Sequence, residues 1–234
     1  MAVLLALILL YGGAVAAQVS PVPVQQAPAP GQDPAYKLLV ENQSVRAFLV
    51  ALDPGQSTGV HEHHRDLMLV ATGPAQFSLI GGEGRLKMPA GEVRVLTGAR
   101  RHSIRNDAQQ PLRLVAIELG KPFDPKRAVC GLGQRACGGE MGGSLTQGAF
   151  VYSVLFETDS FRVVDVTVDP RAAAENFPMK GEYLFVPLTA MQLRKEGAIS
   201  DYASGQAFWV AAGFTNGLEN VGEERARWVA VEVR

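Results

Sequence analysis

The amino-acid sequence predicts an all-β protein made of two related domains. Short apolar runs alternate with turn residues along most of the chain, which is typical of β-sandwiches and β-barrels. Glycine and proline are abundant, at 25 and 14 of 234 residues, and long helical periodicities are absent. An internal repeat predicts that one fold occurs twice.

The first half of the chain contains a series of predicted strands. Ordered structure is expected to begin near Tyr36, because the Pro-, Ala- and Gln-rich stretch before it cannot bury a core. The next apolar runs cover residues 45–52, 67–71, 76–80, 84–88, 93–96, 102–106 and 112–119. Turn signals separate them, such as Gly73-Pro74, Gly81-Gly82 and Pro89-Ala90-Gly91. This spacing predicts a sandwich or a barrel.

The repeat relates the two halves of the chain. Residues 41–46 align with residues 157–162 at an offset of 157 − 41 = 116. Residues 113–119 align with residues 227–233 at an offset of 227 − 113 = 114. The change in offset indicates that the second copy has lost two residues from a loop between these segments.

Three of the four histidines lie in one short stretch. Side chains at positions i and i+2 of a strand share a face, so His61 and His63 point one way and His64 the other. Asp66 follows closely, and His102 lies in a later predicted strand. Several imidazoles with one carboxylate suit a divalent transition metal (Fe, Mn, Ni, Cu or Zn) rather than Ca or Mg. The alternative is that these histidines are surface residues of a loop between strands.

The second copy serves as an internal control for these positions. His61 corresponds to Phe177, His63 to Met179 and Asp66 to Glu182 at offset 116, and His102 corresponds to Asn216 at offset 114. The second copy keeps the strand pattern without any histidine. The fold therefore does not require the imidazoles, and we expect a metal site in the first copy alone.

The motifs resemble those of the cupin superfamily. The first cupin motif matches Gly55, His61-x-His63, Asp66 and Gly73, and the second matches Pro89-x-Gly91 followed by His102-x-x-x-Asn106. The resemblance implies a bicupin, with two tandem cupin-type (double-stranded β-helix or jelly-roll) barrels. Residues 36–120 would form the metal-binding barrel, and residues 150–234 a degenerate barrel without histidine ligands.

The resemblance also implies a ligand set of His61, His63, Asp66 and His102. The family has glutamate where this chain has an aspartate at shorter spacing, so two registers are open. Either Asp66 occupies the glutamate position, or Leu67 does and the site has three histidines. Glu182, aligned with Asp66, favours the first register.

The N-terminal segment and the cysteines predict the cellular compartment. Residues 1–17 are an apolar run followed by small residues, which is typical of a cleaved signal peptide, although a retained anchor is the alternative. Residues 18–35 would form a tether and residues 121–149 a Gly-rich linker. Cys130 and Cys137 in this linker are expected to form a disulfide, which agrees with a secreted or periplasmic protein.

The composition limits the partners. The net charge of −1 and the lack of a basic stripe argue against nucleic acid. After signal cleavage no stable membrane span is expected, and a homodimer is a further prediction. Arg100 is a weak candidate for binding an anionic small molecule, although it and its neighbours Arg101 and Arg105 more simply form a solvated strand edge.

Two functions follow from this reading. The first is an exported metal-dependent oxygenase or isomerase that acts on a small polar molecule. The second is a non-catalytic module that binds a metal or a small ligand. The fold alone does not choose between them.

Overall fold

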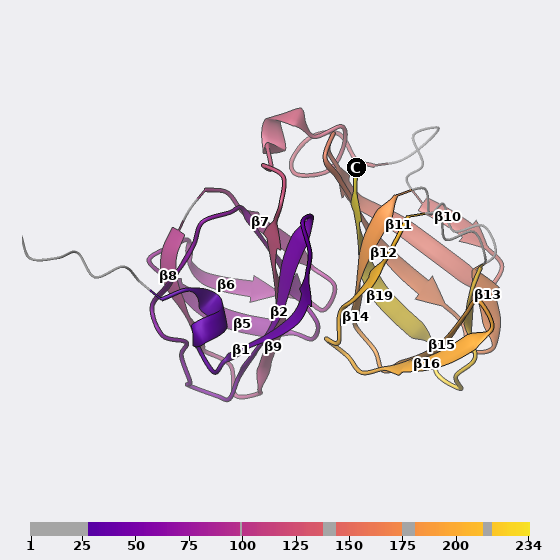
Figure 1. The fold of residues 1–234 in the computed structure, drawn as a ribbon, viewed down its shortest axis with the longest axis horizontal. Helices are drawn as coiled ribbons and strands as arrows, with labels where there is room; N and C mark the ends of the chain where they lie inside the picture. The colour runs from indigo at the N-terminus through magenta and orange to yellow at the C-terminus, as the bar shows by residue number, and fades with distance from the viewer. Residues whose placement is uncertain (1–27, 99, 138–143, 175–180, 213–216) are drawn as a thin grey trace, which may run out of the picture.

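The computed structural model describes residues 28–98, 100–137, 144–174, 181–212 and 217–234. Two antiparallel β-barrels lie side by side, and the chain crosses between them once (Figure 1). Each barrel is made of two facing sheets, which is the jelly-roll arrangement. The prediction of an all-β fold with two tandem barrels is confirmed.

In the described residues the first barrel contains nine strands. They are β1 (Tyr36–Glu41), β2 (Val45–Leu52), β3 (His61–His63), β4 (Leu67–Ala71), β5 (Ala75–Ile80), β6 (Gly84–Met88), β7 (Val93–Leu96), β8 (Arg100–Asn106) and β9 (Leu112–Leu119). The larger sheet has the order β1-β2-β9-β4-β7 and the smaller sheet the order β3-β8-β5-β6.

The second barrel repeats this order with one extra edge strand. Its strands are β10 (Ser144–Gln147), β11 (Phe150–Glu157), β12 (Phe161–Val168), β13 (Ala172–Ala174), β14 (Glu182–Pro187), β15 (Met191–Lys195), β16 (Ala198–Tyr202), β17 (Phe208–Val210), β18 (Leu218–Asn220) and β19 (Ala226–Val233). The sheets have the orders β10-β11-β12-β19-β14-β17 and β13-β18-β15-β16.

The two-residue deletion lies in one hairpin. Leu79 pairs with Gly84 across the β5–β6 hairpin, so residues 80–83 form the loop. Lys195 pairs with Ala198 in the second barrel, so the loop is Glu196 and Gly197 alone. Both of these residues have positive φ, 49° and 84°. Two residues with positive φ form the tight turn that best matches the twist of a hairpin.

Asn106 and Asn220 are equivalent in contacts as well as in sequence. The amide of Asn106 donates to the carbonyl of Leu52 (3.0 Å), and that of Asn220 to the carbonyl of Val168 (3.2 Å). Both acceptors end the second long strand of their barrel. The asparagine of the second motif is therefore a structural clamp in both barrels.

The barrels pack through the outer faces of their larger sheets. One apolar cluster contains Val45 and Ile117 of the first barrel together with Val163 and Val231 of the second. In Figure 1, β2 and β9 accordingly face β12 and β14. This burial between the barrels stabilises the pair by the same hydrophobic effect as a domain core.

The interface has pseudo-twofold symmetry. A Cβ on Gly91 would lie 3.1 Å from side-chain atoms of Asp165 and Leu188. A Cβ on Gly205, which is equivalent to Gly91 (205 − 91 = 114), would lie 3.1 Å from Leu49 of the first barrel, the equivalent of Asp165 (165 − 49 = 116). Each barrel thus presents the same patch to the other, as subunits do in a twofold dimer.

Two buried positions of the second barrel hold larger side chains than their equivalents in the first. Trp228 and Phe185 are fully buried there, with ring centroids 5.6 Å apart. Their equivalents in the first barrel are Leu114 and Leu69. Trp228 and Phe185 are therefore core residues of the second barrel.

The segment before β1 differs from the prediction. Residues 28–35 were expected to be part of a disordered or extended tether, but Pro30–Gln32 form a short 3-10 helix that packs against β1 and β3. The cause is Asp33, whose carboxylate accepts hydrogen bonds from the backbone N–H of Gly59 (2.6 Å) and Ala35 (2.9 Å). Residues 1–27, with the predicted signal peptide, lie outside the described residues.

The segment between the barrels is not wholly a linker either. β10 lies within the range predicted as linker, and it pairs with β11 at the sheet edge. Cys130 and Cys137 form a disulfide with a Cα–Cα distance of 4.9 Å, as predicted. In the described part of the chain, no helix has the length and apolar character to cross a membrane.

Candidate metal centre

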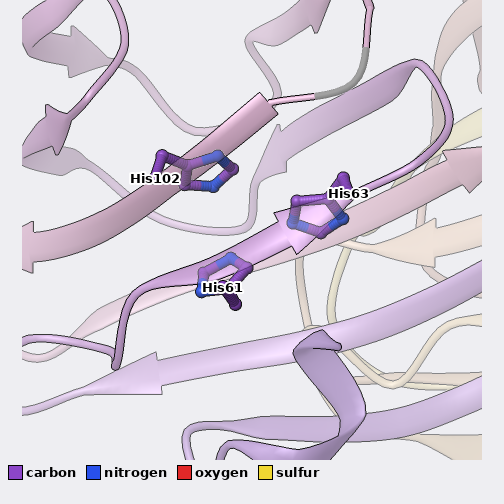
Figure 2. Close-up of side chains that lie close together, drawn as sticks. All are labelled: His61, His63 and His102. Carbon is purple, nitrogen blue, oxygen red and sulfur yellow. The ribbon is translucent and has the colours of Figure 1, made fainter. Parts of the chain in front are cut away.

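Three histidines meet inside the first barrel. His61 and His63 lie on β3, and His61 is the cross-strand partner of His102 on β8. Figure 2 shows the three rings turned toward one another from these two strands. One nitrogen of each ring lies within 4.8 Å of the others. The alternating geometry of β3 therefore does place both imidazoles on one face, next to the third.

The histidine cluster is buried, so the surface-loop alternative does not hold. The exposed fractions of His61, His63 and His102 are 0%, 1% and 1%. His64, in contrast, is exposed on the other face of the segment, where its Nδ1 lies 3.8 Å from Glu62. Burying three imidazoles is costly unless each polar nitrogen finds a partner.

His61 has a partner on each ring nitrogen. Its Nδ1 lies 2.9 Å from the carbonyl oxygen of Gly59, and its Nε2 lies 2.9 Å from the hydroxyl of Tyr36. Because a carbonyl only accepts, Nδ1 carries the proton, and Nε2 accepts from the hydroxyl. Burial lowers the pKa of His61, against a smaller opposing effect of the Gly59 hydrogen bond. His61 is therefore a neutral imidazole whose Nε2 lone pair is the one available to a metal ion, at present accepting from Tyr36.

His63 is oriented by a carboxylate. Its Nδ1 lies 2.8 Å from Oε1 of Glu118, which is itself only 4% exposed. Nδ1 thus donates to the carboxylate, and the Nε2 lone pair faces away from it. Among the described residues this Nε2 has no hydrogen-bond partner, although it is buried. A metal ion bound there would satisfy it.

Glu118 is held in its ionised form. Burial alone would raise the pKa of Glu118, but the hydrogen bond and electrostatic attraction of His63 and the charges of Arg46 and Arg65 outweigh it, and the pKa is lowered. Arg46 reaches the other carboxylate oxygen at 3.3 Å and also pairs with Glu41 at 2.8 Å. A carboxylate behind a ligating histidine is the usual second-sphere arrangement of metal sites.

Asp66 does not join the histidines. Its Oδ1 accepts from the backbone N–H of Gly98 (2.6 Å) and its Oδ2 from that of Phe123 (2.7 Å). Both oxygens are therefore used to hold loops together, and the expected fourth ligand is a structural carboxylate here. The physical reason is the direction of the side chains: Leu67, one residue later, points into the barrel core, and Asp66 does not.

The register in which Leu67 takes the glutamate position, with a site of three histidines, thus describes the geometry better. Leu67 occupies the inward position and pairs directly with Glu118 on β9. The carboxylate near the cluster comes from this neighbouring strand rather than from the strand after the histidines. The spacing of a sequence motif does not indicate that the carboxylate comes from a neighbouring strand.

The arginines around His102 have different surroundings. Arg101 and Arg105 are exposed on the face of β8 opposite His102. Arg105 lies 4.0 Å from Asp107, and with the arginine side chain 58% exposed this long ion pair carries little energetic weight. Arg100 is the cross-strand partner of His63, and its side chain lies outside the described part of the structure. Its role as an anion-binding residue stays a prediction.

Two residues of the site were not predicted from the sequence: Tyr36 and Glu118. Both have equivalents in the second copy, Tyr152 and Glu232. A comparison of the two copies marks residues that differ between them. Tyr36 and Glu118 are the same in both copies, so the comparison does not mark them. The one available signal was Glu118 itself, a carboxylate within the apolar run of β9.

The two jelly-roll barrels, with a buried histidine cluster in the first, give the chain a bicupin-like fold. No protein-family model matches the sequence, and no curated protein matches it, but solved structures of cupin-type proteins are similar over both barrels. A cupin 2 conserved barrel domain protein from Leptotrichia buccalis is 13% identical with a TM-score of 0.52, over 85% of this chain and 88% of that one.

Two further similar structures are enzymes. Bacillus subtilis oxalate decarboxylase, studied for its Mn(II) centres, is 13% identical with a TM-score of 0.54, over 81% of this chain and 69% of that chain. A mutant of salicylate 1,2-dioxygenase from Pseudoaminobacter salicylatoxidans, in complex with gentisate, is 12% identical with a TM-score of 0.59, over 90% and 76% of the two chains. At this level of identity the similarity establishes the fold.

Proposed function

We propose that the chain binds one divalent transition-metal ion through His61, His63 and His102 in its N-terminal barrel, and that the bound ion acts on a small polar molecule. The observation that carries this proposal is the buried cluster of three imidazole nitrogens within 4.8 Å of one another. Nε2 of His63, which has no hydrogen-bond partner among the described residues, supports it, because a buried acceptor without a partner is costly.

The donor set fits such an ion. Neutral imidazoles suit Fe, Mn, Ni, Cu or Zn, and three protein ligands leave coordination positions open for a further molecule. When bound, such an ion polarises a substrate or activates water or oxygen. The chain's own part is to fix the imidazoles, with Gly59 and Glu118 orienting His61 and His63, and to exclude bulk water from them.

The reaction is proposed as oxygenase or isomerase chemistry. The similar structures include an oxalate decarboxylase with Mn(II) centres and a dioxygenase in complex with gentisate, both of which act on small acids by name. The second candidate function is a non-catalytic module that holds a metal or small ligand. The nearly complete burial of the cluster, at 0–1% exposure, favours this candidate, because an enzyme must admit its substrate.

We further propose that the protein is exported. The apolar run at residues 1–17 and the disulfide between Cys130 and Cys137 support a secreted or periplasmic location. The homodimer stays a prediction.

Metal analysis of variants tests the proposal. The wild-type protein is expected to hold about one metal ion per chain, as three clustered imidazoles provide one site. The His61→Ala/His63→Ala double variant should lose it, and His64→Ala should keep it, because His64 belongs to the same segment but is exposed. Equal metal content in all three proteins would contradict the site. Assay of the metal-loaded protein on a panel of small hydroxy and dicarboxylic acids then separates the enzyme from the binding module.

A further inference from the structure

Tyr36 places a hydroxyl group inside the histidine cluster. The residue is at the start of β1 and is 5% exposed, and its hydroxyl lies 2.9 Å from Nε2 of His61. Its ring centroid is 4.8 Å from that of His61 and 6.3 Å from that of His63. The ring of Tyr36 is therefore about as close to His61 as the histidine rings are to one another, and it lies farther from His63.

The hydroxyl and a metal ion require the same lone pair. Nδ1 of His61 is occupied by its proton and the Gly59 carbonyl, so Nε2 is the nitrogen through which His61 can bind a metal. Once Nε2 binds the ion, the hydroxyl of Tyr36 loses its acceptor. A buried hydroxyl without a partner is costly, so a new acceptor at the same place is favoured.

The hydroxyl cannot easily turn away from the site. The backbone N–H of Tyr36 donates to the carbonyl of Asp33 (2.9 Å). The carboxylate of Asp33 in turn accepts from the backbone N–H of Gly59, just before β3. The ring packs edge-on against Phe48 with a centroid distance of 5.9 Å. Asp33 thus holds Tyr36 directly and His61 through Gly59.

The surroundings favour an anion as that new acceptor. The walls near Tyr36 are apolar, including Phe48, Val50 and Ile104. Within the described chain, Glu118 is the carboxylate that hydrogen-bonds the cluster, and it also pairs with Arg46. A divalent ion on three neutral imidazoles therefore leaves net positive charge in a buried site, which a small anion would neutralise.

We propose that Tyr36 orients the external ligand of the metal: in the loaded site its hydroxyl donates a hydrogen bond to a small anion, such as a carboxylate or an azide, at an open coordination position. The inference rests on the proposed function, since it requires the metal. It assigns to Tyr36 a role in binding the anion and no role in holding the ion.

The test measures metal affinity and anion affinity separately. Wild-type protein, Tyr36→Phe and Tyr152→Phe are loaded with Co(II), and azide is titrated while the visible absorption of the ion is followed. Tyr152 is the matched control, because it is the equivalent residue of the second barrel and its hydroxyl accepts from Arg162 at 3.3 Å. Co(II) affinity is determined by competition with a chelator, and thermal unfolding checks that each variant is folded.

The expected result is a split between the two affinities. Tyr36→Phe should bind Co(II) at least as tightly as wild type, since a competitor for His61 is gone, but bind azide about tenfold more weakly, the effect of one lost hydrogen bond. Tyr152→Phe should match wild type in both.

Three outcomes would count against this account. Unchanged azide affinity in Tyr36→Phe overturns the inference. Loss of Co(II) from folded Tyr36→Phe also overturns it, because the hydroxyl would then be a metal ligand. A wild-type protein that takes up no Co(II) overturns the proposed function itself, and the inference with it.

Discussion

Nδ1 of His63 and Oε1 of Glu118 lie 2.8 Å apart, although the residues are 55 positions apart in the sequence. The carboxylate fixes which nitrogen carries the proton, so Nε2 of His63 faces its two neighbours as a free lone pair. The equivalent of Glu118 is Glu232, whose cross-strand partner is Tyr183. The same carboxylate is therefore present in both barrels and contacts a histidine in the first alone.

Replacement of Glu118 is expected to weaken metal binding. Glu118→Gln keeps the size of the side chain but removes the charge that stabilises the donating imidazole, so the metal affinity should fall about 10- to 100-fold. Competition with a chromophoric chelator measures this fall. Glu232→Gln is the control and should leave the affinity unchanged. If both variants bind metal like wild type, Glu118 does not orient His63.

Replacement of Asp66 is expected to affect stability and not metal content. Asp66→Ala removes the acceptor of two backbone N–H groups, from Gly98 and Phe123, which should lower the free energy of unfolding by about 2 kcal/mol. Denaturant unfolding measures the loss, and elemental analysis should still find the metal. A variant of normal stability that has lost its metal would restore Asp66 as a ligand.

The sequence predicts that the histidines form a site, but it does not predict the residues that surround them, for physical reasons. The period of two along a strand places His61 beside His63, and the missing imidazoles of the second copy mark them as dispensable for the fold. Tyr36 and Glu118 approach the site from strands that are distant in sequence, so their role depends on the pairing of strands. Residues 28–35 depend on the same kind of distant contact, because Asp33 is held by Gly59, 26 residues later.

Acid is expected to destabilise the metal-free protein. Because burial lowers the pKa of His61 from its ordinary value of 6.5, the unfolded chain binds this proton more readily than the folded one. The contribution of His61 to stability is therefore complete above pH 6.5 and is lost as the pH falls from there through the lowered pKa. Denaturant titrations of the metal-free protein between about pH 7.5 and about 5.5 measure this loss.

His61→Asn provides the control for this pH dependence. Without the titrating imidazole, the free energy of unfolding should fall less steeply over the same pH range. Equal slopes for wild type and variant would show that His61 does not cause the acid sensitivity.

The contact between the barrels can be tested at Gly91. This residue has φ = 86°, and an added Cβ would lie 2.8 Å from Nη2 of Arg227. Gly55 has a similar φ of 75° but nothing within 4 Å of the added atom. Both Gly→Ala variants should be strained, and Gly91→Ala should lose about 1 kcal/mol more, since it also crowds the interface.

Thermal unfolding compares the two glycine variants. A larger fall in melting temperature for Gly91→Ala is the expected result. Equal falls would show that the loop moves aside and that this contact adds nothing to the pairing of the barrels.

We propose above that three imidazoles of the first barrel bind one metal ion. X-ray absorption at the edge of the metal found in the purified protein tests it most directly, since it reports the type and distance of the ligand atoms. If the three histidines hold the ion, its first shell contains about three imidazole nitrogens, at about 2.0–2.1 Å if the metal is zinc. A shell made of sulfur or of oxygen alone, or a protein that contains no transition metal, would contradict it.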